Sequence, residues 1–395
     1  MRAGIDRRGM AALSSGHMAV DFAGGALPAL LPFFKDRFDL SYTLVAVLVL
    51  ASSVSSSVIQ PLFGLWSDRR GAIWLLPTGV AVGGIGIALA AAAPAYGLVV
   101  LLVVVSGLGT AAFHPEGSKF AAYASGDRRA SGMSVFSVGG NIGYALGAIV
   151  TTPIVVGLGL TGGLLLMIPC LLVAGMLLRL VPFLLSLEPG ERGAARPGGF
   201  AGKDRPGAIV LLLVIVALRS VAWFGLITFV PLWEVSLGHS KSFGSHLLAL
   251  MLLSGAVGTL VAGPAADRFG RRPVLMASNL VVPPGILVFV LVGGVPGAIA
   301  LCVIGPAVVG TFGVTMVMSQ EYLPRHIGMA SGLSIGLSIG LGGIAAVILG
   351  AVADSVDLRT AFFICAAAPL LGAALTTLLP PSRLRTRLAP EIAPS

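Results

Sequence analysis

The stretch SGHMAVDFAGG, residues 15–25, places a histidine and an aspartate inside a long apolar run. His17 and Asp21 are four residues apart, so on a helix their side chains share a face and can touch. Asp21 lies about 11 residues into the run, or ~16 Å along a helix, which is close to mid-membrane. A carboxylate at that depth costs at least ~2.5 kcal/mol, so it requires a partner, a water-filled cavity or a proton. We interpret the pair as proton-handling; the alternative is a hydrogen-bonded pair that packs two helices together.

Arg219 is a second charged residue at comparable depth, about 12 residues into the apolar run that starts near residue 207. Arginine stays charged and can hold a phosphonate or carboxylate through two parallel hydrogen bonds. Trp223 follows one helical turn later and could flank a bound molecule. We expect Arg219 and Trp223 to bind an anionic substrate; the alternative is a permanent ion pair with Asp21. Gln60 and Asn141 lie inside other apolar runs, as substrate-binding or packing groups.

A third polar cluster, GTAAFHPEGSKF, places His114, Glu116 and Lys119 around Pro115. Proline inside a helix frees a backbone carbonyl, and within a membrane this is tolerated where the helix lines a cavity. We therefore add His114 and Glu116 to the candidates for proton coupling. For Glu116 the alternative is a salt bridge with Lys119 or Arg129 at the membrane surface.

The composition defines the elements that must position these residues. The chain has 395 residues, of which 56% are hydrophobic and 10% charged, and its mean hydropathy is +0.99. Soluble domains carry about 25% charged residues. The sequence predicts an all-α integral membrane protein with twelve transmembrane helices, because its apolar segments are long enough to cross a ~30 Å hydrocarbon core. These segments run roughly over 10–34, 41–66, 72–93, 96–123, 129–157, 161–185, 207–235, 241–266, 272–293, 296–322, 326–352 and 357–380.

The basic residues predict the orientation. Most of the 25 Lys and Arg residues fall in alternate loops and in the two tails, whereas the opposite loops hold only Lys35, Arg37, Lys241 and Arg359. By the positive-inside rule both termini are cytoplasmic, and this topology explains the net charge of +9 without nucleic acid. A linker rich in Gly, Pro and charge, residues 188–206, separates a predicted N-terminal bundle, 1–187, from a C-terminal bundle with a cytoplasmic tail, 207–395.

The two halves repeat. GLWSDRRG starts at Gly64 and GPAADRFGRR starts 199 residues later, while ASGMSVFSVGG at residue 130 and ASGLSIGLSIG at residue 330 are 200 residues apart. Matching offsets indicate two equivalent six-helix bundles, the parallel repeat of a transporter. We expect the loop motif to act as a conformational switch. Its residues are Gly64, Asp68, Arg69 and Gly71 in the first copy and Gly263, Asp267, Arg268, Gly270, Arg271 and Arg272 in the second.

This loop pattern, G-x-x-x-D-R-x-G-R-R, resembles the signature of the major facilitator superfamily. The resemblance implies that the loops brace the two bundles, with glycine admitting a neighbouring helix and aspartate meeting its N-terminal amides. The first copy departs from the pattern, because Ala72 and Ile73 replace the final basic pair. The resemblance also implies that the first and seventh helices line a central cavity, where Asp21 and Arg219 would face each other.

The same resemblance implies that the second helix pairs with the eleventh, and the fifth with the eighth, across the bundle interface. Glycines recur every four residues in the fifth and eleventh segments, a spacing that lets helix backbones touch. We expect these stripes to support the rocking of the bundles; generic tight packing is the alternative. They comprise Gly139, Gly143 and Gly147, and Gly332, Gly336 and Gly340.

A finer resemblance rests on several motifs together. A His-x-x-x-Asp first segment followed by LPALLP, then QPLFGLWSDR, FHPEG, GGNIGYALG and an arginine before WFGLITFVPLW, resembles the fosmidomycin resistance protein group of bacterial efflux transporters. It implies proton-driven export of a small phosphonate antibiotic across the bacterial inner membrane by alternating access. Ala148 stands where an exporter motif has proline, so a proton symporter importing a sugar, organic acid or phosphonate stays open.

Other functional classes fit less well. We expect no enzyme, no metal and no cofactor, because the sequence holds no zinc motif, nucleophile elbow or phosphate-binding loop. A membrane scaffold or receptor would not need titratable residues at mid-membrane. The expected partners are a small-molecule substrate, protons and the lipid bilayer, with no nucleic acid, and the expected oligomeric state is a monomer.

Overall fold

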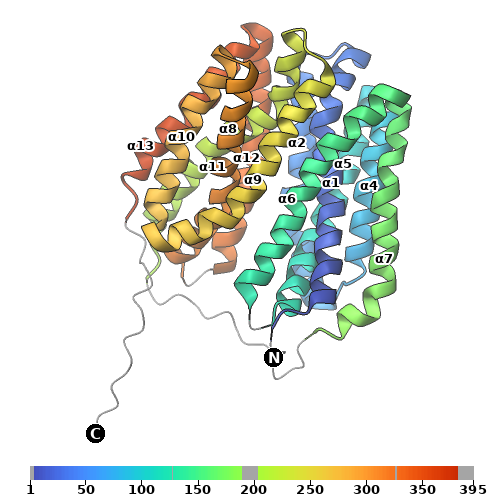
Figure 1. Cartoon of the computed structure of the whole chain (residues 1–395). Coiled ribbons are helices and arrows are strands. Elements are labelled where there is room, and N and C mark those ends of the chain that lie inside the picture. Colours follow the sequence, from blue (N-terminus) through green and yellow to red (C-terminus); the bar gives the residue numbers. More distant parts are fainter. Residues whose placement is uncertain (1–3, 127, 189–202, 325–326, 381–395) are drawn as a thin grey trace.

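The computed structural model describes residues 4–126, 128–188, 203–324 and 327–380, leaving out the side chains of residues 68–70, 129–130, 327–329, 331–332 and 335–338. Its described elements are helical and run roughly side by side (Figure 1). They form two groups of long helices, α1–α7 and α8–α13, which lie next to each other. Their bounds are α1 Arg7–Phe38, α2 Tyr42–Ser53, η1 Val54–Val58, α3 Gln60–Arg70, α4 Leu75–Ala92, α5 Tyr96–Ala124, α6 Arg129–Leu158, η2 Leu160–Leu166, α7 Met167–Leu185, α8 Pro206–Ser236, α9 Lys241–Phe269, α10 Arg271–Leu291, α11 Gly294–Tyr322, α12 Ile327–Ser355 and α13 Leu358–Thr376.

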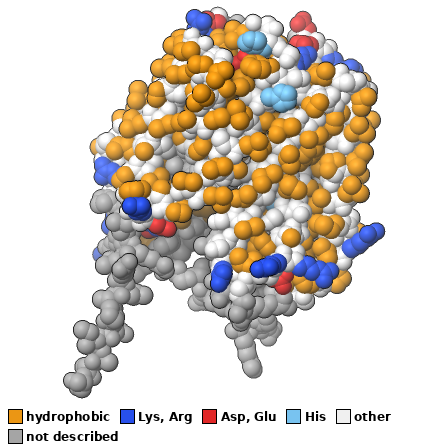
Figure 2. Space-filling model, in the orientation of Figure 1, with side chains coloured by type: hydrophobic (Ala, Val, Ile, Leu, Met, Phe, Trp, Pro, Cys, Tyr) orange, Lys and Arg blue, Asp and Glu red, His pale blue; other side chains and the backbone are white. Residues whose placement is uncertain are grey.

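These elements make the predicted set of spans. Within the described chain, eleven helices are long and apolar enough to cross a membrane, and α12 adds a shorter apolar stretch, Ile339–Ser355. Two of the eleven combine successive elements: α2, the π-helical turn η1 and α3 form Tyr42–Ser67, and η2 with α7 forms Leu160–Leu185. On the face that Figure 2 shows, hydrophobic side chains are spread over the surface between the charged ends, as a lipid-facing surface requires. The two-bundle membrane fold predicted from the sequence is confirmed.

Polar residues set the starts of several spans. The side chains of Asp6, Ser41, Ser240 and Asp357 accept hydrogen bonds from backbone amides in the first turns of α1, α2, α9 and α13, at 2.6–3.2 Å. Such caps satisfy amides that have no partner within the helix. They therefore fix where each helix begins and, with it, the depth of each residue that follows.

The two halves meet along the helix pairs predicted from the resemblance, α2 with α12 and α6 with α9. In the α6–α9 pair, Asn141 donates a hydrogen bond to Thr259 at 3.0 Å, and Thr152 donates to Ser245 at 2.7 Å. In the α2–α12 pair, Gly343 packs against the serine-rich segment of α2, where an added Cβ would lie 3.1 Å from the Cβ of Ser53. The contacts between halves are therefore side-by-side helix contacts.

The glycine stripe of α6 has a different partner from the one expected. Gly139, Gly143 and Gly147 face α1, and a Cβ added at Gly143 or Gly147 would overlap the carbonyl of Met18 or Phe22. The stripe thus seats α1 against α6 inside one half, and it does not lie at the interface with α9. The expectation that it supports rocking between the halves was wrong for α6, because spacing defines a helix face but not its neighbour.

At the end of the molecule away from the N-terminus, polar contacts join the two halves. The carboxylate of Asp354, near the end of α12, accepts from the amides of Tyr42 (2.7 Å) and Thr43 (2.9 Å) and from the Thr43 hydroxyl (2.6 Å) at the start of α2. Lys241, the first residue of α9, pairs with Asp36 near the end of α1. These contacts join the two halves at that end of the molecule.

Candidate functional site

A cavity lies between the halves, with an empty volume of about 890 Å³, part of which is open to solvent. Its wall combines residues from α1, α2, η1, α3, α5, α6, α8 and α12. The apolar part of the lining includes an indole and a phenyl ring of α8, Trp223 and Phe224. The polar part is mainly hydroxyl and amide groups together with one carboxylate and one imidazole: Asp21, Ser52, Ser53, Ser56, Ser57, Gln60, Thr110, His114 and Tyr144.

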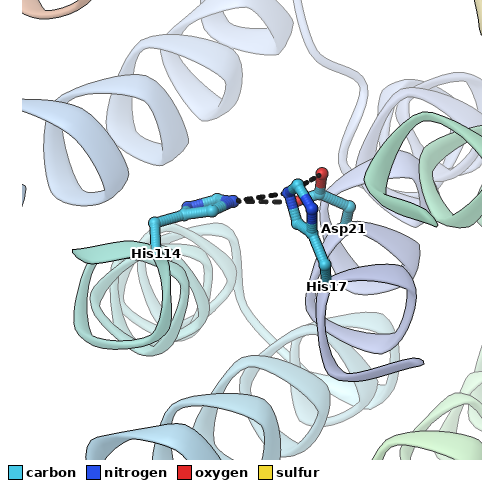
Figure 3. A group of neighbouring side chains, drawn as sticks. All are labelled: His17, Asp21 and His114. Atoms are coloured by element: carbon cyan, nitrogen blue, oxygen red, sulfur yellow. Dashed lines mark hydrogen bonds and ion pairs between the residues drawn. The ribbon is translucent and has the colours of Figure 1, made fainter. Parts of the chain in front are cut away.

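Two of the lining residues, Asp21 of α1 and His114 of α5, form a compact cluster with His17 of α1, which lies behind the cavity lining; we call it the His–Asp–His cluster (Figure 3). The Nε2 atom of His17 lies 3.2 Å from Asp21 Oδ2, as their spacing on one helix face predicted. His114 Nε2 lies 3.3 Å from the other carboxylate oxygen, Oδ1. The two histidine Nε2 atoms are 3.2 Å apart. The three side chains therefore converge on one point beside the cavity.

Contacts with Phe136 of α6 fix the position of the His17 ring. Its Nδ1 atom lies 2.8 Å from the carbonyl oxygen of Phe136 on α6, and its ring stacks on that of Phe136 with centroids 4.2 Å apart. A carbonyl oxygen only accepts, so we assign the Nδ1–H tautomer to His17 when it is neutral. That tautomer turns the Nε2 lone pair toward Asp21 and His114. The helix packing thus fixes both the position and the proton-accepting atom of His17.

This geometry suits the handling of a proton. A neutral His17 would direct a lone pair at a carboxylate, which is unfavourable unless a proton lies between them. Adding a proton to the cluster makes an imidazolium next to Asp21, and a charge-assisted hydrogen bond is about twice as strong as a neutral one. Because Asp21 and His114 also line the cavity, a proton bound by the cluster would lie within reach of the cavity.

The predicted substrate-binding residues separate into two groups. Gln60, the first residue of α3, and Trp223 of α8 both line the cavity. The π-helical turn η1 precedes Gln60, and its wider turn re-aims the residues that follow; such turns are frequent at functional sites. Asn141 instead donates its hydrogen bond to Thr259 across the α6–α9 contact. In this conformation the structure therefore favours the packing alternative for Asn141.

Arg219 is placed differently from the expectation. It is 4% exposed, it does not line the cavity, and its guanidinium donates to the Thr311 hydroxyl of α11 at 2.5 Å. Among the described residues no ion pair joins it to Asp21, so the expected facing pair and the alternative salt bridge are both absent from this conformation. The sequence placed the two residues at a similar depth, but the rotation of α8 directs Arg219 into its own half. There it contacts Thr311, whose hydroxyl lies 3.3 Å from that of Ser278 on α10.

Glu116 follows His114 by two residues in α5 but has other partners. It is 1% exposed, accepts a hydrogen bond from Ser67 of α3, and lies 3.5 Å from the Lys119 ammonium in its own helix. Lys119 also donates to Ser67 at 3.3 Å. The structure therefore favours the salt-bridge alternative for Glu116, which ties α3 to α5 and does not contact the His–Asp–His cluster.

The second loop motif makes contacts within its own half. Arg271 pairs with Glu321 at the end of α11, and Arg272 donates to the carbonyl of Thr377 after α13. Asp267 and Arg268 are exposed, and Gly270 has a φ of +93°, a conformation that favours glycine. A Cβ added at Gly263 would meet nothing within 4 Å. The close helix approach expected at Gly263 is thus wrong for this conformation.

In the first copy, the side chains of Asp68 and Arg69 lie outside the described residues. Gly71 ends α3 with a φ of +60°, which explains the glycine, and a Cβ at Gly64 would lie 3.7 Å from Pro115 of α5. This copy therefore packs α3 against α5. Whether either loop braces the two halves stays a prediction for another conformation.

Sequence reasoning missed several residues of the site. Tyr144 of α6 lines the cavity within the quoted motif GGNIGYALG, but nothing in its type or spacing distinguished it from other aromatic residues. The carbonyl of Phe136 acts through the backbone, so no residue type could reveal it. The serines of α2 and η1 were expected as small packing partners, and four of them also line the cavity.

A cavity between two repeated helix bundles, with titratable groups at mid-depth, defines the class of the protein as a secondary transporter of the membrane. The chain belongs to the major facilitator superfamily, whose family model matches residues 13–245 and 212–394. Family and fold are those of membrane transporters and not of enzymes.

Two relatives and one solved structure illustrate the likeness. The chain is 32% identical over 379 residues to the uncharacterized MFS-type transporter YfnC of Bacillus subtilis (strain 168), covering 92% of this chain and 90% of the relative. It is 30% identical over 381 residues to the fosmidomycin resistance protein of Escherichia coli (strain K12), covering 95% and 93%. It shares its fold with a bacterial homologue of the human lysosomal transporter Spinster, at a TM-score of 0.76 and 16% identity over 94% of this chain and 96% of that one.

Proposed function

We propose that the protein is a proton-coupled transporter that exports a small anionic or amphiphilic drug, similar to fosmidomycin, by alternating access. The observation that carries this proposal is the convergence of His17, Asp21 and His114 beside the cavity between the halves, with Asp21 and His114 in its lining. A proton bound there and a substrate in the cavity act on the same carboxylate, so each can change the affinity for the other. The relative named as a fosmidomycin resistance protein supports the drug class.

The cavity lining supports a substrate that carries oxygen atoms on an apolar body. Ser56, Ser57 and Gln60 can donate hydrogen bonds to an oxyanion, and Trp223 offers an apolar face. Arg219 stays a proposed anion-binding residue for a conformation in which α8 has turned toward the cavity. Its single described hydrogen bond, to Thr311, leaves other guanidinium donors for a substrate.

The closed end of the molecule supports one state of the cycle. If both termini are cytoplasmic, as the basic loops predict, the contacts of Asp354 and Lys241 lie on the outer side. The cavity then opens inward, ready to take up substrate from the cytoplasm. The boundaries of the halves at 187 and 207, the inner-membrane location and the monomeric state belong to this same proposal.

Import by a proton symporter is the second candidate, because a sealed outer side and an inner opening occur in either direction of transport. It has one specific support, Ala148 in α6 in place of the proline of the exporter motif. Growth on candidate sugars, organic acids or phosphonates as the sole nutrient would reveal it.

The decisive experiment is drug susceptibility in an efflux-deficient bacterium that expresses the wild type, Asp21→Asn or an empty vector. Asp21→Asn keeps the size of the side chain and removes the carboxylate that binds the proton. We expect the wild type to raise the inhibitory concentration of fosmidomycin or of another drug in a panel, and Asp21→Asn to abolish that increase. His246→Gln, at an exposed position of α9 outside the cavity lining, serves as the polar control and should keep most of the resistance.

Each result has one interpretation once membrane expression is equal. Resistance in the wild type that persists in Asp21→Asn overturns the role of Asp21 in coupling. A wild type that confers no resistance to any compound overturns export and favours import.

A further inference from the structure

The His–Asp–His cluster also has the make-up of a metal site. Among the described residues, one ligand atom from each of His17, Asp21 and His114 lies within 4.8 Å of the other two (Figure 3). The two Nε2 atoms are 3.2 Å apart. Two ligand atoms about 2.05 Å from one ion and at the tetrahedral angle lie about 3.3 Å apart. The two imidazoles are therefore already spaced as ligands of a single cation.

Electrostatics within the cluster also calls for a cation. Because His17 Nδ1 donates to the Phe136 carbonyl, the Nε2 lone pair of neutral His17 points at Asp21 Oδ2 and at His114 Nε2. One hydrogen on His114 Nε2 can satisfy only one of the acceptors around it. A positive charge among the three side chains pairs with all of them at once, and a metal ion supplies it without any protonation of the histidines.

The surroundings hold the ligands in place. Metal-binding histidines usually donate their second N–H to a carbonyl or carboxylate, which orients the ring, and Phe136 provides this contact for His17. The ring of Phe136, stacked at 4.2 Å, restrains the imidazole further. On the other side Asp21 and His114 border the cavity, which leaves room for a water molecule as a fourth ligand.

We propose that His17, Asp21 and His114 bind a divalent transition-metal ion in the cavity wall. Two imidazoles and a carboxylate favour Zn²⁺, Co²⁺ or Ni²⁺ over Mg²⁺ and Ca²⁺, which prefer all-oxygen sites. A bound ion occupies the place of the exchangeable proton, so it blocks coupled export. This inhibitory consequence rests on the proposed function, whereas metal binding itself does not.

Binding is tested on the purified full chain in detergent, after removal of any histidine tag, by titration with Co²⁺. A four-coordinate Co²⁺ site absorbs strongly in the visible range, and the titration yields its affinity. We expect wild-type protein to show this absorption, and His114→Gln or Asp21→Asn to weaken Co²⁺ binding about tenfold or more. His246→Gln is the matched control, because His246 is an exposed histidine of α9 far along the chain from the cluster.

A variant that replaces one metal ligand by another distinguishes the loss of a ligand atom from the loss of the folded structure. His114→Cys should retain Co²⁺ and add the near-ultraviolet absorption of a thiolate–Co²⁺ bond. No visible absorption in the wild type, or binding that the substitutions at His114 and Asp21 leave unchanged, overturns the proposal. Because the titration needs no transport, metal binding without drug export would reject only the proposed function, and export that Zn²⁺ leaves unaffected would reject only the inhibitory consequence.

Discussion

The side chains around the cavity show how a membrane protein keeps charge at depth. Asp21 is held by two histidines, and Glu116 by Ser67 and Lys119, so neither carboxylate faces lipid. The two groups differ in access: Asp21 borders the cavity, whereas Glu116 is 1% exposed. The difference supports the proposed coupling role of Asp21, whereas the contacts of Glu116 lie in the packing of α3 on α5.

Removing the Glu116 carboxylate should therefore destabilise the protein. Glu116→Ala leaves the Ser67 hydroxyl and the Lys119 ammonium without their buried partner, at a cost of about 1–2 kcal/mol. Thermal unfolding of the purified protein in detergent would show a lower midpoint than that of the wild type. Glu116→Gln, which keeps a hydrogen-bond acceptor for Ser67, should fall between the two. If Glu116→Ala unfolded at the same temperature as the wild type, the Ser67–Glu116–Lys119 contacts would contribute nothing to stability.

The elements of the fold place these residues through close helix packing, in which α6 has the central part. One face of α6 carries Gly139, Gly143 and Gly147 and seats α1, while another carries Asn141 and Thr152 and contacts α9. The α1 face sets the distance between the Phe136 carbonyl and His17. The packing of α1 on α6 therefore sets the geometry of the His–Asp–His cluster.

A larger side chain on the α1 face should separate the two helices. In Gly143→Leu the new Cβ overlaps the backbone of Met18, so the overpacking costs about 1–3 kcal/mol or more. We expect a low yield of monodisperse protein by size-exclusion chromatography. Gly157→Leu is the control on the same helix, because a Cβ there meets nothing within 4 Å. Equal yields from the two variants would contradict the packing role of Gly143.

The sequence predicts contacts within one helix better than contacts between helices. The four-residue spacing of His17 and Asp21 correctly gave their contact, and the apolar runs gave the spans, because both depend on local periodicity. The position of His114 beside them depends on the register of α5 against α1, which no single segment encodes. The prediction that Arg219 faces Asp21 was wrong for the same reason. The depth of Arg219 is a local property of its segment, but the direction of its side chain is set by the rotation of α8.

At the scale of the whole molecule, the two halves are joined by a seal at one end. Asp354 of α12 caps the start of α2, so three hydrogen bonds must break before the halves can part there. Hydrogen bonds of this kind contribute about 1 kcal/mol each, so the seal is reversible within a transport cycle. Its position, away from the cavity, lets the opening of the seal be tested without altering the substrate site.

Locking this seal should stop transport. In a Thr43→Cys, Asp354→Cys double variant the two thiols replace side chains that touch across the seal, with oxygen atoms 2.6 Å apart, and a disulfide between them would lock the halves together. We expect oxidation to abolish drug resistance or transport in vesicles, and a reductant to restore it. Each single variant is a control that oxidation should leave unaffected. Undiminished transport by the oxidised double variant would mean that this end of the molecule does not open.

Arg219 has one further consequence, which is electrical. The residue keeps a fixed positive charge about 13 residues into α8, or ~20 Å from its start, well inside the insulating layer. A charge that crosses the whole membrane field gains or loses ~2.3 kcal/mol per 100 mV. Any rocking of α8 that carries the guanidinium through part of the field makes the balance between inward-open and outward-open states depend on voltage. The energised state of the cell would then set which side of the carrier is open, as well as supplying the protons.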